Sequence, residues 1–166
     1  MKKPEYEYIY NLQKYAVSIL KEGNEAKSLW MLAKYNCSEV SWLVGLKVLG
    51  DLGPTARPFI LKGDVNNSDF EKEENLHDIL GYFDPISKKY IVVDPTIWQF
   101  YPRRRSIYVG AFSSLRDAIK EISKIYAGDW PLSYYVDESN DDIAACKRII
   151  RLNCDQAPKW KGQDKS

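Results

Sequence analysis

The fold is decided by the stretch from Leu76 to Asp94, which reads LHDILGYF at 76–83, DPISKK at 84–89 and YIVVD at 90–94. Its two outer runs are rich in β-branched and aromatic residues, and the middle run has the Asp, Pro and Ser typical of turns. This pattern predicts a β-hairpin whose turn takes residues 84–89.

The register of this hairpin places two polar side chains together. With that turn, Phe83 pairs with Tyr90 and Ile79 lies opposite Asp94. His77, the single histidine of the chain, shares a face with Ile79 because side chains of a strand alternate between its two faces. His77 and Asp94 are then diagonal neighbours on one face, and a slip of one residue would separate them. The Asp94 carboxylate is therefore predicted to orient the imidazole and to stabilise its charged form.

Length and composition set the class of the protein. The chain has 166 residues, 45% of them hydrophobic, and a formal net charge of +1, so we expect a folded domain with no global attraction to nucleic acid. We expect no membrane span and no signal peptide, because no apolar run has the required length and the N-terminus lacks an apolar core. The predicted organisation is one domain over residues 1–155 and a polar tail over 156–166.

The cysteines indicate a reducing compartment. Cys37, Cys146 and Cys154 form no cluster with the spacing of metal ligands, and three thiols cannot all pair. We therefore expect folding in the cytosol, without a metal or another cofactor.

The remaining segments predict an α+β fold, with N-terminal helices packed on a small antiparallel sheet. Apolar periodicity favours helices over residues 5–21, 39–50, 115–126 and 141–152. Short strands are expected at 58–61 and 106–112, a solvated acidic loop at 62–75, and an aromatic connection at 129–135.

Cys37 lies where the central helix begins. The segment from Glu39 to Gly50 is apolar all round after its first turn, which is typical of a buried helix. Ser38 is the expected N-cap. The positive end of a helix lowers the pKa of a thiol and makes it a better nucleophile, so Cys37 is a candidate nucleophile. Cys146 lies at an inward position of the last predicted helix and is expected to belong to the core.

Cys37, His77 and Asp94 occur in the order of a nucleophile, a base and an orienting carboxylate. This order, with Asn36 before the thiol and Gln99 shortly after the carboxylate, resembles the papain-like and transglutaminase-like thiol enzymes. The chain is most similar to their compact bacterial versions, which include toxins and protein-glutamine deamidase effectors. The similar region runs from about residue 35 to residue 126.

The resemblance implies a fold and a set of roles. The fold would be papain-like, Cys37 would attack an amide carbonyl, His77 would transfer the proton, and Asp94 would orient the ring. The family also needs an oxyanion donor besides the backbone N–H of the cysteine. The glutamine that precedes the cysteine in papain is missing here, so the candidates are Gln99 and, as a fallback, Asn36.

Several functions stay open at this point. The leading one is hydrolysis of an amide bond in a protein substrate, by peptide cleavage or by glutamine deamidation. The resemblance implies a bacterial toxin or effector, delivered into the cytosol of a target cell by a specialised secretion system and held in check by a cognate immunity protein. One alternative is acyl transfer of the transglutaminase type. The other is an inactive interaction protein of the same fold.

Overall fold

The structure is a computed structural model, and it describes residues 3–65, 76–137 and 142–157. The elements follow one another as α1 (Lys3–Lys21), α2 (Leu29–Ala33), α3 (Cys37–Leu52), η1 (Pro54–Ala56), β1 (Phe59–Asp64), β2 (Leu76–Asp84), β3 (Lys89–Asp94), η3 (Ile97–Gln99), β4 (Tyr108–Phe112), α4 (Leu115–Tyr126), β5 (Leu132–Tyr135) and α5 (Ile143–Gln156).

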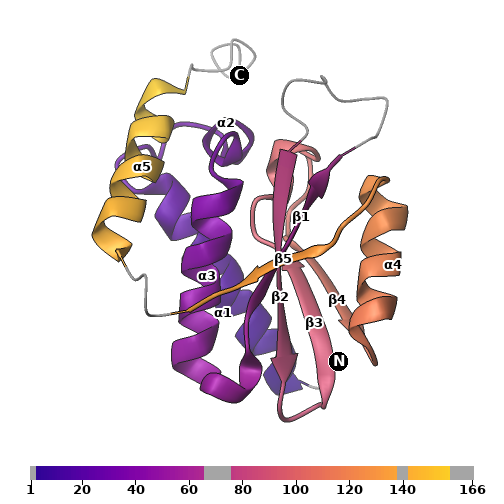
Figure 1. Ribbon diagram of the computed structural model, residues 1–166. Coiled ribbons are helices and arrows are strands. Elements are labelled where there is room, and N and C mark those ends of the chain that lie inside the picture. The colour runs from indigo at the N-terminus through magenta and orange to yellow at the C-terminus, as the bar shows by residue number, and fades with distance from the viewer. Residues whose placement is uncertain (1–2, 66–75, 138–141, 158–166) are drawn as a thin grey trace.

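The strands form one antiparallel sheet in the order β4-β3-β2-β1-β5 (Figure 1). The predicted hairpin register is confirmed, since Phe83 pairs with Tyr90 and Gly81 with Val92. The turn is shorter than expected because Asp84 already pairs with Lys89. The Asp84 carboxylate accepts hydrogen bonds from the backbone N–H groups of the turn, which closes it tightly.

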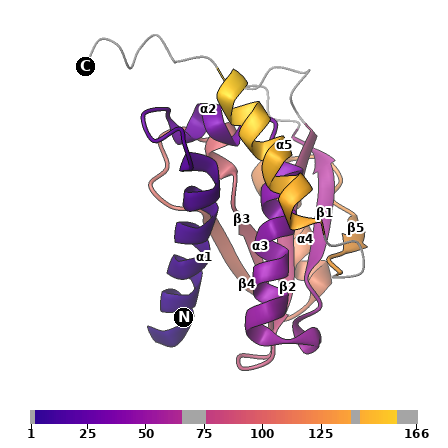
Figure 2. The same cartoon turned by 90° about the vertical axis from the view of Figure 1, so that its left-hand side faces the viewer.

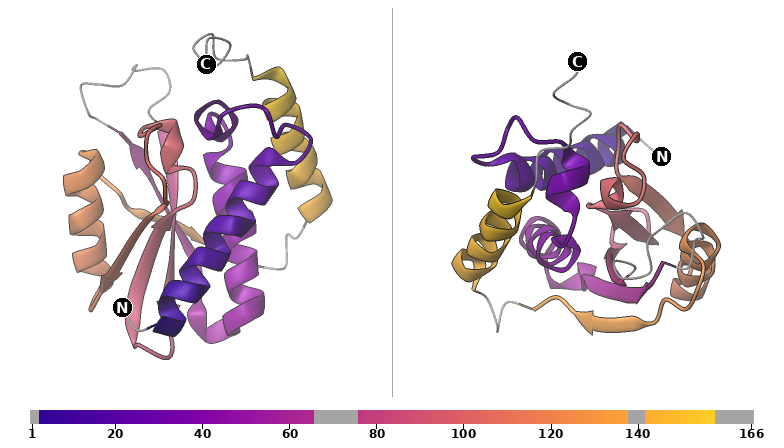
Figure 3. Two further views of the ribbon diagram at one scale, coloured as in Figure 1. Left: turned by 180° about the vertical axis from the view of Figure 1, so that it is seen from behind. Right: turned by 90° about the horizontal axis from the view of Figure 1, so that it is seen from above.

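Helices cover both faces of the sheet and form two cores. The helices α1, α3 and α5 lie on one side and α4 lies on the other (Figures 1 and 2). Successive side chains of a strand point to opposite faces of the sheet. Leu80 and Val93 therefore join the core beneath α3, whereas Ile79 and Val92 join the core beneath α4. A view from above shows the sheet between the two helical layers (Figure 3). The expected α+β arrangement of helices on a small antiparallel sheet is confirmed.

The central helix α3 packs closely on β2. Gly45 makes this approach possible, because a Cβ there would lie 2.8 Å from Cγ2 of Val136 and 3.1 Å from Cδ1 of Leu80. The helix begins at Cys37 with Asn36 as N-cap, so the expected N-cap at Ser38 is wrong by two residues. The thiol therefore belongs to the first residue of the helix.

Other segments also differ from the sequence-based expectations. β1 continues to Asp64 into the segment expected as a loop, and residues 66–75 of that segment lie outside the described residues. The aromatic connection at 129–135 contains the edge strand β5, which pairs with β1. The helix α5 extends to Gln156, the first residue of the predicted tail, and residues 158–166 are not described.

Across the described residues, no helix has both the length and the apolar character required to cross a lipid bilayer.

Candidate active site

Three chain segments meet at one end of the sheet and bring together the residues singled out from the sequence. Cys37 opens α3, His77 is the second residue of β2, and Asp94 is the last residue of β3. Each side chain stands at the end of a rigid element, where helix and strand geometry fix its position more firmly than a loop would.

His77 and Asp94 form a buried pair. Nε2 of His77 lies 2.7 Å from Oδ2 of Asp94, and both side chains have an exposed fraction of 0%. The hairpin register explains the contact, because both side chains point to the face that α4 covers. A buried charge needs a partner, and each of these two groups supplies one for the other.

Asp94 has two further partners. Its Oδ1 accepts a hydrogen bond of 3.1 Å from the backbone N–H of Thr96, and its Oδ2 also accepts one from the hydroxyl of Tyr126. Tyr126 is the last residue of α4 and is fully buried. Sequence reasoning missed Tyr126. Its only sequence signal is its position on the inward apolar face of α4, which indicates packing and not a hydrogen bond to a carboxylate.

Aromatic rings enclose the His77 imidazole. The ring centroids of Phe100, Tyr126 and Trp130 lie 4.7, 5.7 and 6.2 Å from that of His77. Gly63 pairs with His77 across the sheet and lets Trp130 approach, since a Cβ at Gly63 would lie 2.8 Å from the indole ring. This shell keeps water away from the His77–Asp94 pair, which strengthens their electrostatic interaction.

Cys37 lies beside the histidine at the N-terminus of α3. Its Sγ is 3.9 Å from the carbonyl oxygen of Leu76, the residue before His77, and the exposed fraction of Cys37 is 9%. The N–H groups of the first helical turn have no acceptor within the helix, so they are available to an anion beside the thiol.

The pKa of His77 reflects these neighbours. Burial by itself lowers the pKa of an imidazole, but the charge of Asp94, the hydrogen bond to Asp94 and the interaction with Cys37 raise it to about 10. His77 is therefore an imidazolium at neutral pH. Because Asp94 occupies Nε2, Nδ1 is the ring nitrogen left for the thiol, and it has no other hydrogen-bond partner among the described residues.

The two candidates for the oxyanion donor differ in their surroundings. Gln99 ends η3 and is half-buried, and η3 packs against α2, the helix that leads to Cys37. The Nδ2 of Asn36 donates to the carbonyl of Leu32 at 2.7 Å and lies 3.4 Å from Sγ of Cys154. The Asn36 amide therefore links α2, α3 and α5.

The other two thiols lie in different environments. Burial raises the pKa of Cys146 to about 11, with a further contribution from Glu39, and burial also raises the pKa of Cys154. Both thiols are therefore protonated at neutral pH. Within the described ranges no group of three or more His, Cys, Asp or Glu side chains is arranged to hold a metal ion.

Comparisons of the chain with protein-family models, with curated proteins and with solved structures found no match.

Proposed function

We propose that the protein is a cysteine-dependent hydrolase that attacks an amide bond of a protein substrate. The observation that carries this proposal is the buried hydrogen bond of 2.7 Å between Nε2 of His77 and Oδ2 of Asp94 beside a thiol at a helix N-terminus. A nucleophile, a base and an orienting carboxylate are the three parts that thiol catalysis requires.

The reaction would begin from an ion pair. His77 takes the proton of Cys37, and the imidazolium is stabilised by Asp94. The thiolate attacks the amide carbon, an S–C bond forms, and the carbonyl electron pair moves to oxygen. The backbone N–H of Cys37 and the amide of Gln99 would stabilise this oxyanion, each donor contributing about 3 kcal/mol.

His77 would then complete both halves of the reaction. Its Nδ1–H protonates the leaving nitrogen, the C–N bond breaks, and a thioester remains on Cys37. Water attacks the thioester with His77 as general base, and the acid is released as the thiol leaves. A peptide amide yields a new amine terminus, whereas a glutamine side chain yields ammonia and glutamate.

Comparison of Cys37 with Cys146 gives a direct test of the proposed nucleophile. The half-buried Cys146 is the more exposed of the two, so alkylation governed by access alone would modify Cys146 first. Activation by His77 predicts the opposite order, with Cys37 reacting faster with iodoacetamide at pH 7. Mass spectrometry of the peptides measures both rates, and His77→Ala should reverse the order. Slow modification of Cys37 in the native chain would contradict the proposal.

The reaction itself is tested with cell proteins exposed to the native chain and to Cys37→Ala. New peptide termini that require Cys37 identify a peptidase, and Gln-to-Glu conversion identifies a deamidase. If neither product depends on Cys37, the proposed hydrolase is wrong.

Gln99 and Asn36 form a matched pair for the oxyanion donor. Gln99→Ala should lower kcat by roughly 10²–10³ with little change in substrate binding, because this hydrogen bond strengthens as charge develops on oxygen. Asn36→Ala should chiefly lower stability, since its amide joins three helices. A normal kcat in Gln99→Ala would assign the second donor elsewhere.

A further inference from the structure

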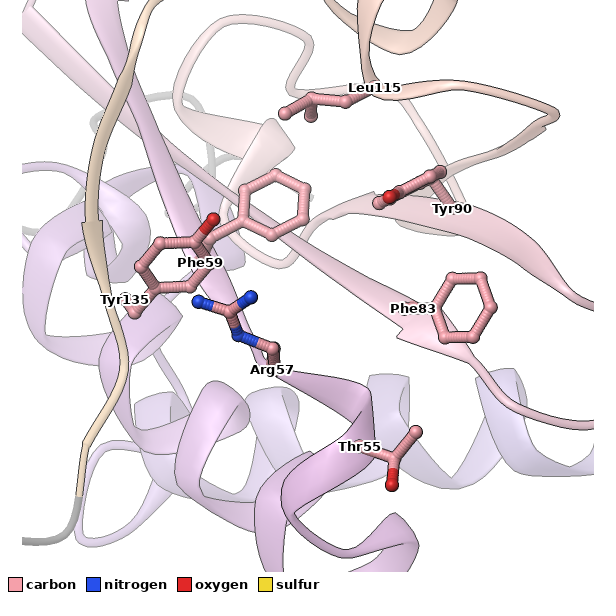
Figure 4. A pocket seen from close by; sticks show the side chains of 7 residues that line it. All are labelled: Thr55, Arg57, Phe59, Phe83, Tyr90, Leu115 and Tyr135. Carbon is pink, nitrogen blue, oxygen red and sulfur yellow. The ribbon is translucent and has the colours of Figure 1, made fainter.

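A pocket of about 230 Å³ lies at the opposite end of the sheet face that α4 covers, next to the β2–β3 turn. Its lining residues come from η1 and the adjoining chain, β1, β2, β3, α4 and β5, and are Thr55, Arg57, Phe59, Phe83, Tyr90, Leu115 and Tyr135 (Figure 4). Phe83 follows His77 by six residues on β2, so the pocket is about 20 Å from the candidate active site. It is a separate feature of the molecule.

The walls of the pocket are aromatic. Phe59 pairs with Gly81, where a Cβ would lie only 2.3 Å from its ring, so the ring occupies the space above the glycine. The rings of Phe83 and Tyr90 meet edge to face at 5.5 Å and form the opposite wall. Both are half-buried, so apolar surface remains accessible here. Cavities of about 150 Å³ hold a benzene ring, and this pocket therefore has room for one bulky side chain.

Arg57 places a positive charge at this aromatic site. Its guanidinium lies over the Tyr135 ring, 4.5 Å from the centroid, and is directed toward Phe59 (Figure 4). Among the described residues no carboxylate forms an ion pair with it. Its five N–H groups are therefore positioned to bind an anion in the fork geometry of a guanidinium.

The backbone of Arg57 supports a role for its side chain. The residue has a φ of 38° and a ψ of 63°, a left-handed conformation that glycine adopts freely and that costs energy for a residue with a Cβ. Such strained positions are often found at binding sites, where the side chain is needed despite the strain.

We infer that this pocket binds a peptide segment in which a bulky apolar side chain lies next to a carboxylate. The apolar side chain would enter between Phe59 and the Phe83–Tyr90 wall, and the carboxylate would accept hydrogen bonds from Arg57. A single guanidinium neutralises one carboxylate, and the volume fits one side chain rather than a base with its sugar. This inference does not depend on the chemistry of Cys37.

The experiment compares two probes that differ only in charge. N-acetyl-L-phenylalanine carries the ring and the carboxylate, and N-acetyl-L-phenylalanine amide carries the ring alone. NMR titration of the full chain should give saturable shifts at the Leu115 methyl groups and at Arg57 Nε–H. The acid should bind about fivefold more tightly than the amide, the factor that a partly exposed ion pair supplies.

Two variants make the test specific. Arg57→Met keeps the apolar stem and should remove the preference for the acid while the amide binds as before. The control Arg116→Met alters an exposed arginine of α4 that does not line the pocket, so it should keep the preference.

Three results would overturn the inference: shifts that do not saturate at the pocket residues, equal affinity for acid and amide, or a preference that survives Arg57→Met. Cys37→Ala should bind the probes as the native chain does, so a failed hydrolase assay and a failed pocket are distinguishable.

Discussion

At the two ends of the sheet face beneath α4, the charged side chains differ in how far they are buried. At one end His77 and Asp94 are completely buried, and each charge is paired. At the other end Arg57 is exposed, and Tyr135, beside it, has an exposed fraction of 45%. One end is closed around an ion pair, and the other presents a cation and aromatic surface to solvent.

At each end a glycine of the sheet leaves room for an aromatic ring, but the two rings differ in what they cover. Gly63 leaves room for Trp130, which follows α4 and closes over His77. Gly81 leaves room for the Phe59 ring, against which the partly exposed Tyr135 ring packs edge to face at 6.4 Å. The chain that leaves α4 therefore makes one end a protected site for charge, whereas the other end stays open to solvent. Four predictions test this difference.

The largest effect is expected from Asp94→Ala. This change leaves the His77 imidazolium buried without a counter-ion, so the free energy of unfolding should fall by about 3–5 kcal/mol. Urea denaturation measures it, with Asp64→Ala at an exposed strand end as the control that should change stability by less than about 0.5 kcal/mol. A loss similar to that of the control would mean that water reaches the pair.

The second prediction is a decrease of stability with rising pH. The pKa of His77 is raised from the ordinary value of 6.5 to about 10 by folding, so the folded chain holds a proton that the unfolded chain releases above pH 6.5. The contribution of His77 is complete below pH 6.5 and is lost as the pH rises toward 10, at up to about 1.4 kcal/mol per pH unit.

Denaturation of Cys37→Ala, which removes the thiol proton of the proposed ion pair, should therefore show a loss of about 2 kcal/mol between pH 6.5 and 8.5, most of it below pH 8 and so before the remaining thiols and the tyrosines reach their ordinary pKa values. Asp94→Asn should flatten this dependence, because the charge that raises the His77 pKa is gone. An equal slope in both chains would assign the titration to another group.

Tyr126→Phe is expected to have the third effect. The ring contacts stay, but Asp94 loses one donor, which should lower the free energy of unfolding by about 1.5–3 kcal/mol. The pKa of His77, followed by NMR of its ring protons, should rise further because Asp94 keeps more of its charge. The matched control is Tyr101→Phe, whose hydroxyl makes a longer bond of 3.5 Å to the carbonyl of Ile125. Equal losses in the two variants would remove Tyr126 from the buried network.

The smallest effect is expected from Arg57→Gly at the open end. Relief of the left-handed strain offsets the greater flexibility of glycine in the unfolded chain, so stability should change by less than about 0.5 kcal/mol. Lys88→Gly, at a φ of 60° in the hairpin turn, is the matched control. A loss above about 1 kcal/mol at Arg57 alone would show that the guanidinium braces the fold instead of serving a ligand.

The sequence by itself determined the hairpin and its register. Alternation in β2 and β3 and the turn residues at 84–87 are local signals, and they placed His77 and Asp94 on one face. The start of α3 was also predicted to within two residues, because an apolar run after Asn36 and Ser38 marks a helix N-terminus.

Only the tertiary structure decided how the site is enclosed. Tyr126 bonds to a carboxylate 32 positions earlier, and neither residue carries a local sign of the other. The edge strand β5 was read as a connection because its pairing with β1 joins distant segments. Local patterns report periodicity and turns, whereas contacts between distant segments depend on how the elements pack. This is the physical reason why the placement of His77 beside Asp94 could be predicted, but the aromatic shell around them and the Arg57 pocket could not.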